Sequence, residues 1–227
     1  MDQYDAALHL LDRQVVGSDD RPVAKVDDVE LTVEPDGTLV PTALLVGLPA
    51  LLPRFGGRLG PWLLQRYVDL GTMQADRAEP SVIDLGLVAS VSSEIRLSVP
   101  GADVVRRRVD QGVPSAMERW RLGALVGLPV RCERLPRRSC VLDVRLTGPL
   151  AEPGRSRVGA LVVGPGRPGA LLGYDRRREP GPRAVAEVVR WLHRHARVVQ
   201  LGTEVEIDRE AGEVRIGSGA SLLPLLG

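Results

Sequence analysis

The sequence predicts a mainly β protein made of two small β-barrel domains, each with a short helix, arranged as a pseudo-twofold tandem repeat. Three observations predict this fold class. Residues 10–32 align without a gap on residues 125–147, at an offset of 115 positions. Short apolar segments are separated by turn residues and show no strand–helix–strand alternation, which favours a small barrel or sandwich. Hydrophobic residues make up 44% of the chain, which is enough to form a core.

The internal repeat is supported by identical residues at aligned positions. Asp28 aligns with Asp143, and Leu31 aligns with Leu146. Three further segments follow in the same order at nearly constant offset: 43–47 with 160–164, 82–86 with 198–202, and 95–97 with 214–216. A repeat of this length indicates a duplicated domain and not a solenoid unit. The predicted organisation is a first domain (1–100), a helical linker (101–123), a second, diverged domain (124–217) and a tail (218–227).

The start of the first half predicts a β-hairpin. Residues 4–11 fit either a helical turn or a first strand, and both alternatives stay open. Residues 22–33 alternate between apolar and polar side chains, which is typical of a half-buried strand. Residues 34–37, with the sequence EPDG, predict a tight turn, because glycine tolerates positive φ. The apolar residues 39–47 then form the returning strand.

The rest of the first half predicts a short helix followed by two more strands. Residues 61–70 fit a helix with proline at its first position. Residues 82–91 and 94–99 predict a second pair of strands. Beyond them, residues 101–123 predict two short helical pieces, broken by glycine and proline, that link the domains.

The second half predicts the same order of elements. Residues 141–146 and 158–164 predict two strands, and the glycine- and proline-rich segment that follows predicts a loop. Residues 183–197 have apolar side chains at helical spacing and predict the best helix of the chain. Residues 198–207 and 213–216 predict a closing hairpin, and the small apolar tail predicts weak packing.

Charge is unevenly distributed although the net charge is only +1. Residues 1–112 contain 11 Lys/Arg and 17 Asp/Glu, whereas residues 113–227 contain 19 and 12. Halves of opposite sign could attract each other or steer different partners, and compositional drift after duplication explains the difference equally well. Aromatic residues make up 3% of the chain, which argues against a stacking platform for single-stranded nucleic acid.

Histidine and cysteine indicate no metal site. His193 and His195 lie two positions apart on a predicted helix, so they point to different faces and cannot share a metal ion. His9 stands alone. Cys132 and Cys140 give neither a metal-binding pattern nor a disulfide framework.

Carboxylates and glycine-rich segments give no catalytic constellation either. Asp27 and Asp28 are neighbours on a predicted strand and project to opposite faces, which is the wrong geometry for an acid–base pair. Asp143 at the matching position of the repeat favours a structural role for Asp28. Residues 164–169 are glycine-rich but lack the lysine and hydroxyl residue of a phosphate-binding loop. We therefore expect no enzyme activity, no cofactor, and no catalytic, cofactor-binding or metal-binding residues.

Arginine is concentrated in three groups: 106–108, then 131, 134, 137 and 138, then 176–178. Such groups could contact RNA phosphates, which would give salt-dependent affinity without sequence readout. They could equally pair with acidic patches on a partner protein or with the acidic first half of this chain.

The strand pattern resembles the PRC-barrel family, a domain found in the photosynthetic reaction-centre H subunit and in a bacterial ribosome maturation factor. The family pattern is an L-x-G-x-x-V phrase, a turn, a strand of the form G-x-V-x-D-x-x-L/V, and an apolar strand ending in glycine. In this chain it is carried by residues 11–16, 22–31 and 43–47. Ala24 replaces the frequent glycine. The second half keeps the strand at 139–144, but residues 134–137 have lost the usual turn. The resemblance implies a six-stranded barrel in each half and a role in binding and assembly.

The leading hypothesis is therefore a non-enzymatic interaction or assembly module with one or more unidentified protein partners. The alternative is an RNA- or ribosome-associated factor that uses the arginine-rich second half. A third hypothesis is an enzyme whose site is assembled between the halves. The sequence is also compatible with a homo-oligomer. It predicts no membrane insertion and no signal peptide, and hence a cytoplasmic location.

Overall fold

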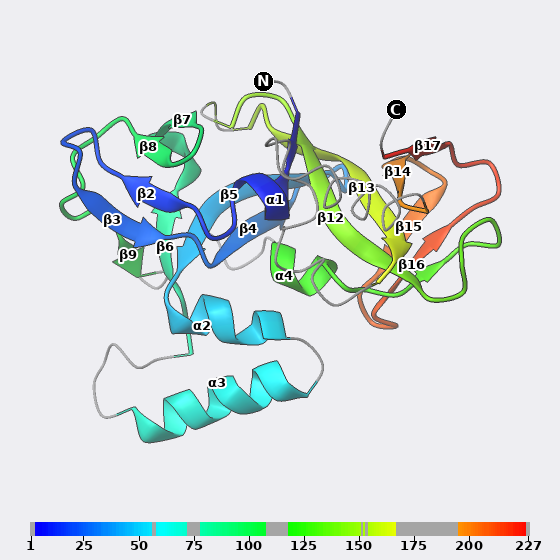
Figure 1. Cartoon of the computed structure of the whole chain (residues 1–227), viewed down its shortest axis with the longest axis horizontal. Coiled ribbons are helices and arrows are strands. Elements are labelled where there is room, and N and C mark those ends of the chain that lie inside the picture. Colours follow the sequence, from blue (N-terminus) through cyan, green and yellow to red (C-terminus); the bar gives the residue numbers. More distant parts are fainter. Residues whose placement is uncertain are drawn as a thin grey trace, which may run out of the picture. The chain divides into compact units, whose positions relative to one another are not determined.

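A computed structural model describes residues 3–55, 58–71, 78–107, 118–150, 152, 154–166 and 195–225 (Figure 1). The chain divides into two compact units, and both are built mainly from β-strands. The first unit comprises residues 1–2, 9–124 and 148–157, and the second comprises residues 3–8, 125–147 and 158–227. Residues 3–8 thus cluster with the second unit and residues 148–157 with the first, whereas the sequence-based division assigned them the other way round.

The larger sheet of the first unit has the strand order β10-β4-β5-β6-β9. Its strands are β4 (Asp28–Val33), β5 (Leu39–Val46), β6 (Ser81–Asp84), β9 (Arg106–Arg107) and β10 (Arg119–Arg121). A tight turn joins β4 to β5, as predicted: the Glu34 N–H donates to the Thr38 carbonyl oxygen at 2.8 Å, and Gly37 has a φ of 82°. Only glycine adopts this φ at little cost, which is why the EPDG sequence ends the strand there.

The smaller sheet of the first unit has the order β3-β2-β8-β7, with β2 and β8 parallel. Its strands are β2 (Gln14–Val16), β3 (Pro22–Lys25), β7 (Val88–Val91) and β8 (Ile95–Leu97). The single strand predicted over 22–33 is therefore wrong in one respect, because the chain changes sheets at residues 26–27. The Val26 N–H donates to the Arg13 carbonyl oxygen, and the Asp27 N–H donates to that of Leu45, so successive amides bond to different sheets.

Helical segments interrupt the first unit between β5 and β6. They are α2 (Leu48–Leu51), the 3₁₀ helix η1 (Leu52–Phe55) and α3 (Leu59–Leu70), and a further 3₁₀ turn, η2 (Leu85–Leu87), follows β6. The predicted helix over 61–70 is confirmed, although it begins two residues earlier. Ala50 of α2 is fully buried in a cluster with Ala43, Leu45 and Val82 of the sheet.

The larger sheet of the second unit has the order β1-β12-β13-β14-β17. Its strands are β1 (Gln3–Asp5), β12 (Ser139–Thr147), β13 (Arg157–Pro165), β14 (Arg197–Gln200) and β17 (Leu222–Pro224). The N-terminal residues contain both of the elements that the sequence left open, because β1 is followed by α1 (Ala6–His9). The tail does not merely pack weakly, since β17 pairs with β14.

The smaller sheet of the second unit has the order β11-β16-β15. Its strands are β11 (Val130–Arg131), β15 (Val205–Asp208) and β16 (Glu213–Ile216). The short helix α4 (Leu122–Leu125) precedes β11. β15 and β16 form a hairpin, whereas β14 pairs with β13, so the strand predicted over 198–207 is two strands in different sheets.

Two further segments are predicted from the sequence to be helical, the linker 101–123 and residues 183–197. The described ends of the linker 101–123 contain the strands β9 and β10, both of which extend the larger sheet of the first unit. β10 is a strand because its R-W-R alternation places Trp120 opposite Leu31 at the sheet edge. Of the helix predicted over 183–197, residues 183–194 lie outside the described residues, and Arg197 already belongs to β14.

Each unit thus places a larger sheet and a smaller sheet around buried Val, Leu and Ile side chains. Within the described ranges no sheet closes on itself, so the predicted closed barrels are not seen. None of the described helices is long and apolar enough to cross a membrane.

Candidate interaction surfaces

The helical insert of the first unit, Leu48–Leu70, is held firmly at its base. The Gly47 N–H donates to the Asp27 carboxylate at 2.6 Å. Arg54 Nη1 donates to the Asp27 carbonyl oxygen at 2.9 Å, and Arg121 Nη1 donates to the Pro49 carbonyl oxygen at 3.0 Å. Burial raises the pKa of Asp27, partly offset by the Gly47 hydrogen bond and by Arg54. Asp27 therefore anchors the insert to the sheet.

The insert exposes several large apolar side chains. Seven large hydrophobic side chains are exposed among the described residues, and five of them lie on the insert: Leu48, Phe55, Leu59, Trp62 and Leu70. Trp62 is 55% exposed and Leu70 is 77% exposed. Isolated exposed apolar residues are ordinary, but a concentration of them on one element marks an interaction surface.

Helix α3 buries a single residue, Gly60. A Cβ atom at Gly60 would lie 2.8 Å from the Pro53 carbonyl oxygen, so glycine allows α3 to approach the η1 backbone directly. This contact fixes the helix while leaving Leu59 and Trp62 exposed. Figure 1 shows α3 lying beside α2.

Basic side chains surround the apolar surface of α3. The Arg66 guanidinium lies 5.8 Å from the centroid of the Trp62 ring, within cation–π range. Arg58, four residues before Trp62, is exposed. Asp69 accepts a hydrogen bond from the Gln65 side chain at 2.7 Å. The insert therefore exposes Trp62 with an arginine four residues before it and another four residues after it, the second lying over its ring.

A second kind of site is formed where short segments dock on the edges of the two larger sheets. We call residues 3–8 the N-terminal arm and residues 119–124 the middle arm. In the first unit, Asp28 Oδ1 accepts hydrogen bonds from the Gly123 N–H of the middle arm at 2.9 Å and from the Val29 N–H at 2.8 Å. Burial raises the pKa of Asp28 to about 6, opposed by these two hydrogen bonds and by Arg54 and Arg121.

Asp143 has the corresponding role in the second unit. Its carboxylate accepts hydrogen bonds from Ala7 at 2.8 Å, from Leu8 at 3.2 Å and from Val144 at 2.7 Å, all from backbone N–H groups. Asp143 is completely buried. Both aspartates therefore accept hydrogen bonds from backbone amides, and each holds an arm on its sheet.

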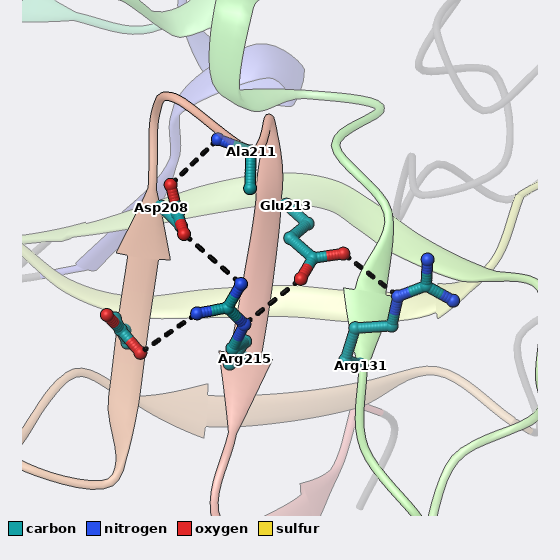
Figure 2. A network of polar contacts seen from close by, with 6 residues as sticks. Arg131, Asp208, Ala211, Glu213 and Arg215 are labelled. Carbon is teal, nitrogen blue, oxygen red and sulfur yellow. Dashed lines mark hydrogen bonds and ion pairs between the residues drawn. The ribbon is translucent and has the colours of Figure 1, made fainter.

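An ion-pair network covers the smaller sheet of the second unit (Figure 2). Arg215 of β16 contacts three carboxylates: Glu213 at 3.0 Å, Asp208 at 3.2 Å and Glu206 at 3.7 Å. Glu213 also accepts from Arg131 of β11 at 2.9 Å, and these arginine bonds lower its pKa. The side chain of Arg215 is 48% exposed, so the network is accessible to solvent.

The smaller sheet of the first unit has a matching but simpler pair. Arg96 of β8 contacts Asp20 at 2.6 Å and Glu94 at 2.7 Å. Glu94 precedes Arg96 by two residues, as Glu213 precedes Arg215. These hydrogen bonds raise the pKa of Arg96.

The arginine groups are only partly available to a phosphate backbone. Arg131 is engaged by Glu213, and the Arg134 side chain donates to the Ala220 carbonyl oxygen. Arg137 and Arg138 are exposed. Residues 176–178 and Arg108 lie outside the described residues.

The remaining candidates are not brought together. His9 ends α1, His195 is exposed, and His193 lies outside the described residues, as do residues 167–169 of the glycine-rich segment. Cys132 and Cys140 are free and half-buried, and burial raises the pKa of Cys140. In the part of the chain that the structure describes, no three His, Cys, Asp or Glu side chains are grouped as metal ligands.

Comparison with known proteins gives no family: no protein-family model and no curated protein matches this sequence. Sequence reasoning missed both the helical insert and the two arms as surfaces. One signal could have indicated the insert, because the single Phe of the chain and one of its three Trp residues lie within this segment of an aromatic-poor protein.

Proposed function

We propose that this protein is a non-enzymatic interaction module that binds a partner protein through the helical insert. The observation that supports it most is that, of the seven large hydrophobic side chains exposed in the described ranges, five lie on Leu48–Leu70. Desolvating such a patch is favourable in proportion to the apolar area that it removes from water. The hydrogen bonds at the base of the insert favour binding further, because a surface that is already ordered loses less entropy on association.

The chemistry of the insert specifies its partner. Trp62 is suited to fill an apolar pocket, and tryptophan and arginine are frequent in the centres of protein interfaces. Arg58 and Arg66 stand four residues before and after Trp62, so a complementary surface has acidic side chains around an apolar centre. We therefore commit to a partner protein with an apolar pocket and an acidic rim.

An RNA-associated role has weaker support. Arg131 is neutralised by Glu213, and the Arg134 side chain is engaged by the Ala220 carbonyl oxygen. Among the described residues of the three arginine groups, this leaves Arg106, Arg137 and Arg138 exposed, which gives only a small electrostatic footprint.

Tandem duplication and membership of the PRC-barrel family form part of the proposal, as does a cytoplasmic location. Duplication is supported by strand register: Ala43 lies opposite Asp84 and Ala160 opposite Gln200, at aligned positions of the repeat. The two larger sheets also have the same order of arm strand, hairpin strands and following strand. The family resemblance adds the expectation of binding and assembly.

The experiment compares three forms of the full chain: wild type, Trp62→Ser and Leu223→Ser. Leu223 is a matched control, since it is also an exposed large hydrophobic residue, at 47%, but lies on β17. Each chain is used to capture proteins from its native extract, and the captured protein is then purified and its affinity for each variant measured. We expect wild type and Leu223→Ser to bind one partner equally and Trp62→Ser to bind at least about tenfold more weakly, as for an interface anchor.

Two results would contradict the proposal. Equal binding by all three chains would remove the insert from the interface. Self-association that disappears in Trp62→Ser would identify a second copy of the chain, and not an acidic-rimmed partner, as the occupant. RNase-sensitive capture of ribosomal RNA would favour the alternative function.

A further inference from the structure

The two arms dock on their sheets in the same register. In the second unit, Tyr4 of the N-terminal arm lies opposite Leu146 of β12. In the first unit, Trp120 of the middle arm lies opposite Leu31 of β4. Both leucines are completely buried. Each docking site therefore receives an extended segment with an aromatic side chain at the same position.

The charge next to the aromatic residue is inverted between the two sites. Asp5 of the N-terminal arm lies opposite Arg145, and Arg145 donates to its two carboxylate oxygens at 2.7 and 3.2 Å. At the matching register position of the first unit, Arg121 of the middle arm lies opposite Glu30. The signs of the opposed residues are thus inverted between the sites. Asp5 and Arg145 form an ion pair, whereas Arg121 and Glu30 are opposed in register while Arg121 donates to the Pro49 carbonyl oxygen and Glu30 accepts from Thr42.

Exchange of the arms would place like charges together. The N-terminal arm on β4 would bring Asp5 opposite Glu30, and the middle arm on β12 would bring Arg121 opposite Arg145. The two carboxylates are nearly buried, with Asp5 8% exposed and Glu30 5% exposed, so water would screen their repulsion poorly. Like charges directly opposite on neighbouring strands are destabilising.

We propose that the edges of β12 and β4 are two docking sites for β-strands, and that the charge of one residue on each edge selects the strand that binds there. We call this selection by charge the charge code. Backbone pairing supplies affinity at both edges, and a single side-chain position supplies selectivity, as in other cases of β-augmentation. The β12 site accepts a segment with an aromatic residue followed by an acidic one. The β4 site accepts an aromatic residue followed by a basic one. This inference does not depend on the proposed function of the helical insert.

The first test reverses charges in the full chain and measures hydrogen exchange of the arm amides. Asp5→Arg places Arg opposite Arg145, and exchange over residues 3–8 should become roughly tenfold faster or more. Exchange over residues 119–124 should not change. The double variant Asp5→Arg/Arg145→Glu restores a pair of opposite charges and should restore protection. Arg155→Glu, which disturbs an exposed pair with Glu152, is the control and should leave both arms protected.

Selectivity is tested with labelled peptides that span residues 3–9, added to the Asp5→Arg chain, whose own arm is weakened at the β12 edge. The natural peptide should bind, and the peptide with the Asp5→Arg change should bind at least about tenfold more weakly. Equal binding of the two peptides, or no binding of either, would overturn the charge code. Failure of the double variant to recover protection would also overturn it, because geometry and not charge would then select the arm.

Discussion

Asp28 and Asp143 hold equivalent arms in the two units, but their carboxylates are stabilised differently. Asp28 accepts two backbone N–H groups, and its charge is also compensated by Arg54 and Arg121. Asp143 accepts three N–H groups and is completely buried. Both carboxylates therefore accept backbone N–H groups, three at Asp143 and two at Asp28, and two guanidinium groups also act on Asp28.

This difference shows what a repeated strand pattern does and does not determine. Main-chain register is kept between the units because a shift by one residue would turn every buried side chain toward solvent. The charged side chains beside each arm are under no such constraint. They can diverge while the backbone stays the same, and this divergence distinguishes the two arms.

The largest difference is expected when each aspartate is removed. Asp143→Ala leaves three backbone N–H groups, one buried and two partly buried, without their acceptor and should cost about 3 to 5 kcal/mol. Asp28→Ala leaves two such groups and removes a carboxylate that is itself costly to bury, so it should cost about 2 to 3 kcal/mol. Denaturant unfolding of both variants measures the two costs.

Hydrogen exchange supplies the control for this comparison. Asp143→Ala should accelerate exchange at Ala7 and Leu8, and Asp28→Ala should accelerate exchange at Gly123. Equal costs, or acceleration that is not confined to the arm concerned, would mean that the number of hydrogen bonds does not set the difference.

The next largest effect is the change in the free energy of unfolding with pH as Asp28 titrates. The pKa of Asp28 is about 6, above the ordinary value of 3.8, so the folded state binds this proton more tightly than the unfolded state. Raising the pH through this interval therefore destabilises the fold. Between pH 4 and pH 7, wild type should lose about 2 kcal/mol relative to Asp28→Asn, which cannot titrate. Denaturant unfolding at both pH values measures the difference, and parallel pH profiles of the two chains would refute the assignment.

Substitutions at Gly123 in the middle arm and at Ala7 in the N-terminal arm should have smaller, unequal effects on the free energy of unfolding. A Cβ atom at Gly123 would lie 2.9 Å from Asp28 Oδ2 and 3.0 Å from Arg54 Cγ, so Gly123→Ala must displace one of them and should cost about 1 to 2 kcal/mol. Ala7→Gly removes no such contact and should cost about 0.5 to 1 kcal/mol through backbone entropy. Thermal unfolding distinguishes them, and an equal or larger cost for Ala7→Gly would show that the Asp28 site is not tightly packed.

Local patterns in the sequence indicate where β-structure and turns lie, because alternation and turn chemistry act over a few residues, but they do not show that residues 22–33 and 198–207 each divide between two sheets. The EPDG turn and the strands on either side of it are confirmed. The arms could not be assigned in this way. Residues 3–8 carry a strand signal of only three residues, and their partner strand β12 lies about 140 positions later in the chain.

The interaction surfaces were harder to predict for a different physical reason. Apolar residues such as Leu59 and Trp62 look like core residues in a sequence, and only the close approach of Gly60 to the Pro53 carbonyl oxygen leaves them exposed. The match of Asp28 with Asp143 in the sequence points to a structural role, and its carboxylate accepts two backbone N–H groups. Its partner, the Gly123 N–H, is 95 positions away and has no side-chain signal.

The smallest contrast concerns the two surface arginines. Arg215→Met leaves three carboxylates close together on the smaller sheet of the second unit, whereas Arg96→Met leaves only Asp20 and Glu94. Repulsion should therefore accelerate hydrogen exchange of the β15–β16 hairpin more than that of β7–β8. Both effects should shrink at high salt, because the charges are exposed.

Glu206→Gln is the control for this last comparison, since Glu206 is 68% exposed and lies 3.7 Å from Arg215. Its removal should leave exchange of the hairpin almost unchanged. Placed on the Arg215→Met background, the same change should slow exchange, because one of the three repelling charges is then absent. If Glu206→Gln has the same effect on both backgrounds, the carboxylates do not interact through Arg215, and the network contributes nothing to the difference between the two sheets.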